Sequence, residues 1–204
     1  MNFLDTIVVI PRAQWNAKQA KKEEEIEEVP VPYLVVYHDH KNRCRTENEC
    51  MKVIEQIQKD HMDKGESDIL YHFIVTMDGN IYEGRSTKSV GMKFPENESF
   101  KVVNKKSITV GCLDNGEKEV SIPVLKSFLK VTEKLRREGV INYDVHLKIH
   151  FPKGHPREKD TQNDSEEVFS AMRMMGGSSG FNETNLDSKK SKEKKRAKKS
   201  KSKR

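Results

Sequence analysis

Runs of apolar residues separated by turn residues divide the first part of the chain into expected strands. These runs are rich in β-branched and aromatic side chains, as in strands buried on one or both faces. Asp78 and Gly79 between two such runs are typical of a hairpin turn. The expected strands are 6–10, 33–37, 69–77, 80–83, 107–113 and 145–151.

Three other segments repeat apolar residues at three- and four-residue spacing, which predicts helices. The first follows a cap at Thr46 or Asn48 and ends at Lys64–Gly65, and the second runs from Ser121 to just before Gly139. The third covers 166–175. Their apolar faces are Cys50, Val53, Ile54, Ile57 and His61 in the first, Val124, Leu125, Phe128, Leu129, Val131 and Leu135 in the second, and Val168, Phe169 and Met172 in the third.

The order of these elements combines a hairpin with crossover helices, which indicates an α/β domain with a central mixed β-sheet flanked by helices. We assign this domain to residues 1–175. Gly176–Gly180 is a flexible linker, and the residues after it lack apolar periodicity. Residues 176–204 are therefore expected to be a disordered linker and Lys-rich tail.

The charge is divided unevenly along the chain. The formal net charge is +6, yet Lys189–Arg204 alone contributes +10 and the remaining residues are net acidic. A basic tail suits nuclear import through an importin, nucleic acid, an anionic membrane surface, or simple solvation. The candidate targeting residues are Lys194, Lys195, Arg196, Lys198 and Lys199.

The start of the chain does not read as a secretory signal, because Asp5 interrupts the early apolar stretch. No run approaches the roughly 20 apolar residues of a membrane span. As written, the chain is expected to be intracellular, cytoplasmic or nuclear. A start codon further upstream would make a secreted protein possible.

Several motifs occur in the order found in peptidoglycan recognition proteins, and the chain resembles this family over residues 7–175. An Asp-Gly hairpin leading into Tyr-Glu-Gly-Arg is one of them. The motifs that carry the resemblance are Ile10-Pro11-Arg12-Ala13-Gln14-Trp15, Val31-Pro32-Tyr33-Leu34-Val35-Val36, Asp68-Ile69-Leu70-Tyr71-His72-Phe73 and Asp78-Gly79-Asn80-Ile81-Tyr82-Glu83-Gly84-Arg85.

The resemblance implies the fold of the type 2 N-acetylmuramoyl-L-alanine amidases, in which a mixed sheet carries a groove on one face. It also implies binding of peptidoglycan fragments in innate immune recognition, with an immune signalling protein as a second kind of partner. Cys44 and Cys50 occupy the positions of the family's small disulfide, and in a reducing compartment they would be thiols.

Catalytic members of the family are zinc amidases, and their ligands are poorly matched here. Tyr37 stands where the family has its first His, and no Cys follows Cys112, although Asp160 or Asp164 could be proposed. His150 is a candidate second ligand, and Tyr71 matches the catalytic Tyr, here as a relic. An improvised site would use His38 and His40 with His146, His150 or His155.

We therefore expect a non-catalytic protein without a cofactor that binds muropeptides. The alternatives are a zinc amidase, with His38 and His150 as candidate ligands, and an interaction protein that has lost peptidoglycan binding. The groove has lost aromatic positions of the family, since Ser86-Thr87 replaces a Gly-Trp pair. The predicted groove residues are Tyr37, His38, Asp39, His40, Tyr71, Arg85 and Lys93.

Overall fold

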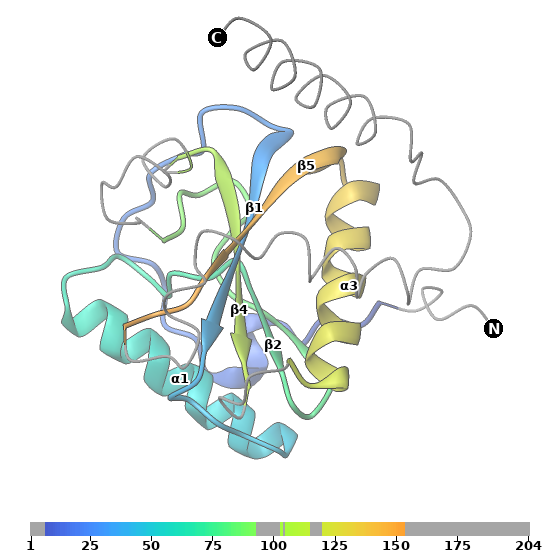
Figure 1. Cartoon of the computed structure of the whole chain (residues 1–204). Helices are drawn as coiled ribbons and strands as arrows, with labels where there is room; N and C mark the ends of the chain where they lie inside the picture. Colours follow the sequence, from blue (N-terminus) through green and yellow to red (C-terminus); the bar gives the residue numbers. More distant parts are fainter. Residues whose placement is uncertain (1–6, 93–102, 104, 115–119, 154–204) are drawn as a thin grey trace, which may run out of the picture. The chain divides into compact units, whose positions relative to one another are not determined.

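The structure is a computed structural model that describes residues 7–92, 103, 105–114 and 120–153 (Figure 1). The helix expected over 166–175 and the tail lie outside these residues. None of the helices in the described part is long and apolar enough to cross a membrane. The elements are η1 (Arg12–Trp15), β1 (Val31–Asp39), α1 (Glu47–Asp63), β2 (Phe73–Thr76), β3 (Ile81–Glu83), β4 (Ser107–Leu113), α3 (Ile122–Arg137) and β5 (Ile141–His150).

The strands form one five-stranded sheet in the order β3-β2-β4-β1-β5. The β2–β3 hairpin is antiparallel, whereas β2–β4, β4–β1 and β1–β5 are parallel pairs. The predicted mixed sheet is thus confirmed. In its centre, Tyr37 of β1 pairs in register with Gly111 of β4 on one side and His150 of β5 on the other.

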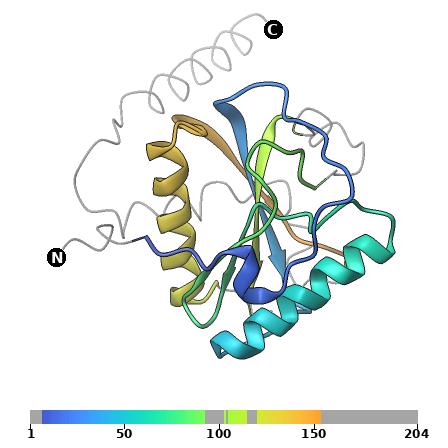
Figure 2. The same ribbon diagram turned by 180° about the vertical axis from the view of Figure 1, so that it is seen from behind.

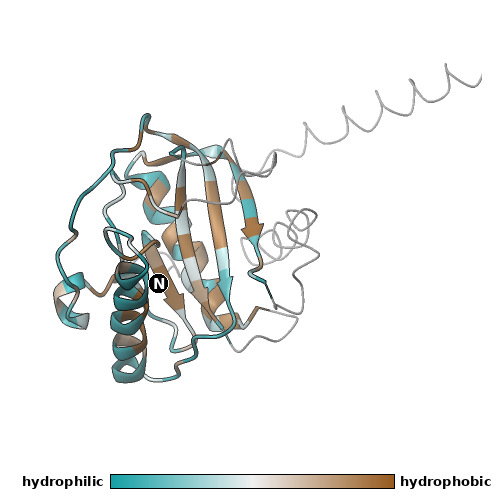
Figure 3. Ribbon diagram, turned by 90° about the vertical axis from the view of Figure 1, so that its left-hand side faces the viewer, coloured by the Kyte–Doolittle hydropathy of each residue, from teal (hydrophilic) through white to brown (hydrophobic). Residues whose placement is uncertain are grey.

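The helices α1 and α3 lie on opposite sides of the sheet (Figures 1 and 3). Helix α3 packs mainly on β2, β4 and β5. Helix α1 lies beside η1, as the view from behind shows (Figure 2), and together they bury an apolar cluster against the sheet. Because α1 stands at one side, the strands beside it carry no described helix on this face (Figure 3).

Helix α1 begins at a capping box, in which the side chains of Thr46 and Glu49 each accept a hydrogen bond from the other's backbone amide. Cys50, in its first turn, forms a disulfide with Cys44, and both residues are buried. This disulfide ties the start of the helix to the chain that leaves β1. In this structure the predicted pair, Cys44 and Cys50, is thus disulfide-bonded.

Three predicted boundaries were wrong. Residues 7–10 form only an isolated bridge, Ile10 to Tyr82, because they run along the edge of β3 for a single pair. Strand β2 begins at Phe73 rather than at 69, since the backbone groups of Ile69 and Leu70 bond to side chains rather than to a neighbouring strand. Strand β5 begins four residues earlier than expected, at Ile141.

His72 sits in the interior between β4 and the segment after β3. Its Nδ1 accepts a hydrogen bond from the Thr109 amide at 2.9 Å, so its Nε2 carries the proton donated to the Ser89 carbonyl at 2.8 Å. Burial lowers the pKa of His72 to about 4, against an ordinary value of 6.5. The fold therefore holds this side chain neutral.

This burial predicts a stability that depends on pH. Between about pH 6.5 and 4, His72 is protonated in the unfolded chain but stays neutral in the folded protein. The unfolding free energy therefore falls as the pH drops through this window. The loss is on the order of 3 kcal/mol at its acid end. Urea unfolding across this range measures it. His72→Asn, which cannot titrate, is expected to unfold with a shallower pH slope; an unchanged slope would refute the assignment.

Candidate ligand-binding site

Aromatic rings lie in two contacting sets on the side of the sheet that carries α1, and we call them together the aromatic strip. It follows β1 and β5 because residues two apart on a strand share a face. The register brings Tyr33 beside His146 and Tyr37 beside His150, and the chain between α1 and β2 adds Tyr71. The members of the strip are Tyr33, Tyr37, Tyr71, His61, His146 and His150.

Tyr37 is the centre of the strip. Its ring stacks on His150, with centroids 5.3 Å apart and planes at 26°, and it contacts Tyr71 at 5.5 Å. The ring is half-buried. Burial, assisted by the charge of Asp39, raises the pKa of Tyr37 to about 12. At neutral pH the side chain is therefore an uncharged phenol, able to stack and to donate a hydrogen bond.

Tyr71 forms the inner wall of the strip, with 1% of its surface exposed. Its ring lies against Gly111, where even a Cβ atom would come within 2.6 Å of the ring. Glycine at this strand position is what allows the ring to lie flat on the sheet. Burial, followed by the charge of Asp39, raises the pKa of Tyr71 well above its ordinary value.

His61, at the end of α1, is a member of the strip that the sequence did not identify. It meets Tyr71 edge-on at 5.6 Å, and its Nδ1 accepts a hydrogen bond from the Leu70 amide at 3.2 Å. Burial lowers the pKa of His61 to about 4, so the acceptor is available at neutral pH. The sequence pattern placed His61 on the inner face of the helix, but nothing in the pattern distinguished it from a core residue.

The predicted groove residues that follow Tyr37 lie on the other face of the sheet or at the end of β1. His38 points to the other face of the sheet, where it is buried, packs on Phe151 and lies 3.8 Å from Asp114. The Asp39 carboxylate accepts hydrogen bonds from the amides of Lys41 and Asn42, which closes the turn after β1. His40 comes after the strand has ended, and Lys93 lies outside the described residues.

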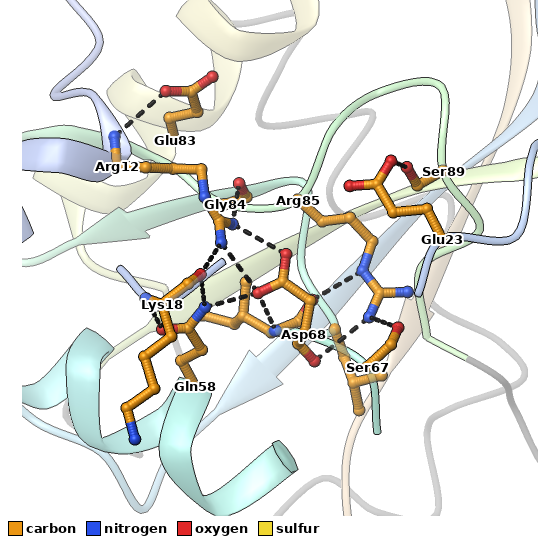
Figure 4. A network of polar contacts seen from close by, with 12 residues as sticks. Arg12, Lys18, Glu23, Gln58, Ser67, Asp68, Glu83, Gly84, Arg85 and Ser89 are labelled. Atoms are coloured by element: carbon orange, nitrogen blue, oxygen red, sulfur yellow. Dashed lines mark hydrogen bonds and ion pairs between the residues drawn. The ribbon is translucent and has the colours of Figure 1, made fainter. Parts of the chain in front are cut away.

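Arg85 is likewise placed in the interior, with 6% of its surface exposed. Its guanidinium donates to the backbone carbonyl of Asp68 at 3.2 Å (Figure 4). It also donates to the carbonyls of Ile69, at 2.9 Å, and Val90. A guanidinium is well suited to this task because it offers five donors in a fixed plane. The predicted groove residue is therefore a support for the chain that leads to Tyr71.

The structure also contains a cavity of about 790 Å³ that is separate from the strip. Its lining comes from the N-terminal segment, the end of β3 and the end of α3, and its charges are mixed. Arg12 and Lys134, two of its cations, are already paired with Asp68 and Glu138. Of the predicted groove residues, Arg85 lines this cavity, whereas Tyr37 and Tyr71 belong to the aromatic strip.

The side chains at the strip do not fit a zinc site. Zinc in such sites is held by His nitrogen, Cys sulfur and carboxylate oxygen. Tyr37 occupies the place of a first ligand as a protonated phenol, and His38, the neighbouring candidate, faces away from His150. Among the described residues, no group of three His, Cys, Asp or Glu could hold a metal ion.

The chain is similar in sequence to several peptidoglycan-recognition proteins. Peptidoglycan-recognition protein SC2 of Drosophila melanogaster is 29% identical over 116 residues, which are 50% of this chain and 62% of that protein. Peptidoglycan-recognition protein 3 of Holotrichia diomphalia is 31% identical over 125 residues, 61% of this chain and 62% of the relative. The matched part thus spans less than two thirds of these relatives. No family model matches the chain.

Solved structures of peptidoglycan-recognition proteins match the fold of this chain. The structure of bumblebee PGRP-SA matches with a TM-score of 0.63 at 29% identity, covering 71% of this chain and 83% of that one. Drosophila PGRP-LB matches with a TM-score of 0.64 at 24% identity, covering 88% and 100%. The chain therefore has the fold of peptidoglycan-recognition proteins and type 2 amidases, as its motifs predicted.

The contact between Tyr71 and Gly111 predicts a specific coupling. Gly111→Ala would place a methyl group 2.6 to 2.9 Å from three ring atoms of Tyr71, so we expect it to destabilise the fold by about 1–3 kcal/mol. In a Tyr71→Ala background the clash is absent, and the alanine should be nearly neutral. A double-mutant cycle of urea unfolding measures the coupling. Equal effects of Gly111→Ala in both backgrounds would rule out the close contact.

Proposed function

We propose that this protein binds peptidoglycan fragments at the aromatic strip and does so without zinc chemistry. The observation that carries the proposal is the ring contact of Tyr37, which lies beside His150 and Tyr71 as an uncharged aromatic side chain at the position where the resemblance implies a metal ligand. The curated relatives are peptidoglycan-recognition proteins, which supports the ligand class.

Two structures of the same fold were solved with such ligands. One is human PGRP-IβC in complex with a glycosamyl muramyl pentapeptide, and the other is PGRP-LE in complex with tracheal cytotoxin, a monomeric diaminopimelic acid-type peptidoglycan. Both are below 25% identity to this chain, so they support the fold and suggest the ligand.

The strip has the chemistry that such a ligand needs. Muropeptides present sugar rings and amide groups, and aromatic faces pack well on both while Tyr and His side chains supply hydrogen bonds. The rings are held in place before binding, because the Tyr71 ring packs against Gly111 and the Tyr37 ring lies between those of Tyr71 and His150. Preorganised side chains lose little freedom on binding, which favours affinity.

A role in innate immune recognition follows from this proposal and from the relatives. We further propose that the protein signals or regulates through binding rather than by cutting the muramoyl–alanine bond. An immune signalling protein as second partner, an intracellular location and the targeting role of residues 194–199 stay predictions.

The binding proposal predicts the effect of removing the central ring. Tyr37→Ala should raise the dissociation constant for a soluble muramyl pentapeptide at least tenfold, because it removes the central ring, which contacts both Tyr71 and His150. Isothermal titration calorimetry measures it. Tyr143→Ala is the control, since Tyr143 is also in β5 but is 75% exposed and lies beside Arg136 of α3.

Two outcomes count against the proposal. One is native affinity in Tyr37→Ala. The other is wild-type binding that disappears when salt is raised, because ordinary screening would then identify adsorption through exposed basic residues rather than recognition by rings.

The zinc amidase is the alternative, and metal analysis separates it from the proposal. The purified protein is expected to hold far less than one equivalent of zinc and to leave muramoyl–alanine bonds intact, because Tyr37 and His38 do not supply a ligand next to His150. Stoichiometric zinc that is lost in His150→Ala or in His38→Ala would show that a metal site forms after all, and would favour the amidase.

A further inference from the structure

The chain that carries Tyr71 has no regular structure of its own. Residues 67–72 connect α1 to β2 without belonging to a helix or a strand. In such a segment the backbone groups must find other partners, because a buried amide or carbonyl without one is costly. Here many of those partners are side chains.

Asp68 is the first anchor of this segment. Its carboxylate accepts from the following amide, Ile69, at 2.7 Å and from the Gln58 side chain of α1 at 2.6 Å. The Arg12 guanidinium contacts both carboxylate oxygens, each at 3.0 Å (Figure 4). The carboxylate is nearly fully buried, with 3% of its side chain exposed, so the paired cation is its main compensation for lost hydration.

The remaining backbone groups are held from two other sides. Arg85 donates to the Asp68 and Ile69 carbonyls, and its own amide donates to the Tyr71 carbonyl at 2.8 Å. The ring of His61 accepts from the Leu70 amide. Each residue from Asp68 to Tyr71 thus has a backbone group bound to Asp68, Arg85 or His61, and only His72 returns to the sheet, through Thr109.

The N-terminal segment anchors residues 67–72 through the Arg12 side chain and through the Lys21 amide, which donates to the Ser67 carbonyl at 2.9 Å; Arg12 is the anchor that acts on Asp68. It begins η1, and its guanidinium also donates to the Gly84 carbonyl at 2.6 Å and the Lys18 carbonyl at 2.8 Å. It lies over the ring of Trp15, 5.4 Å from the centroid. One side chain therefore joins the N-terminal segment, the chain after β3 and the segment that carries Tyr71.

We propose that Arg12 is a positioning residue for the aromatic strip: by holding Asp68 it fixes residues 67–72, and so it sets the position of Tyr71 against Tyr37. Ligand binding at the strip then depends on the N-terminal segment, although that segment provides no ring to the strip. The effect on ligand affinity rests on the proposed function, whereas the effect on the position of residues 67–72 does not.

Three variants test this in the full-length protein. Arg12→Met removes the guanidinium and keeps an unbranched chain, Arg12→Lys keeps the charge but cannot bridge both oxygens, and Arg137→Met removes an exposed cation of α3 that pairs with Glu133. Folding is checked by circular dichroism and cooperative urea unfolding. The position of the segment is read by hydrogen exchange of the Ile69–His72 amides relative to Val110–Cys112 in β4.

The expected result has two parts. Exchange of the Ile69–His72 amides is at least tenfold faster in Arg12→Met, intermediate in Arg12→Lys and unchanged in Arg137→Met, while the β4 amides keep their protection. The dissociation constant for the muramyl pentapeptide follows the same order and rises at least tenfold in Arg12→Met. If Arg12→Met does not fold, Arg12→Lys carries the test with a smaller change in the same direction.

The outcomes separate this inference from the proposed function. Folded Arg12→Met with native exchange at Ile69–His72 and native affinity overturns the positioning role. Faster exchange with unchanged affinity also overturns it, because Tyr71 would then not need the anchor. If the wild-type protein binds no muramyl peptide, the proposed function fails, and the exchange of Ile69–His72 still decides whether Arg12 holds the segment.

Discussion

The ion pair between Arg12 and Asp68 is the interaction on which the arrangement of the site depends. It buries a carboxylate that also bonds Gln58 of α1 and the backbone before Tyr71. Without the guanidinium, the buried carboxylate would keep only its bonds to the Gln58 side chain and the Ile69 amide, and its charge would lack a counter-ion. Because β2 starts only after His72, the sheet cannot replace this anchor, and the inner wall of the strip is held by side chains.

The second constraint is steric. Tyr71 lies on Gly111, and Gly111 lies in register with Tyr37, so the two tyrosines are brought together by the absence of a side chain on the strand between them. His150, on the other side of Tyr37, completes the row. Tyr71, Tyr37 and His150 are thus neighbouring rings, and this arrangement is what supports the proposal that the site binds a ligand.

Much of the fold was predictable from local pattern. The apolar spacing gave α1 and α3, the Asp-Gly pair gave the β2–β3 hairpin, and the order of elements gave a mixed sheet. The boundary of β2 was not predictable, because 69–72 is as apolar as a strand and the bonding of its backbone to Arg85 and His61 depends on distant residues. The strand predicted over 6–10 was wrong for a related reason: at the edge of β3, Ile10 forms only an isolated bridge with Tyr82.

The site was predictable in part. Tyr37 and Tyr71 were singled out by their motif positions, and the register of β1 and β5 unites them with His150. His38 was predicted to face the groove, but neighbouring residues on a strand point to opposite faces, and His38 lies on the other one. Arg85 was predicted to contact the ligand because it is a charged residue in a motif, but its guanidinium bonds the backbone instead.

If rings rather than a metal hold the ligand, binding does not depend on zinc. Calorimetric titration of the full-length protein with a muramyl pentapeptide, in the presence and absence of a strong zinc chelator, decides this. We expect saturable binding with the same dissociation constant in both conditions. Binding that is lost with the chelator and restored by added zinc would contradict it.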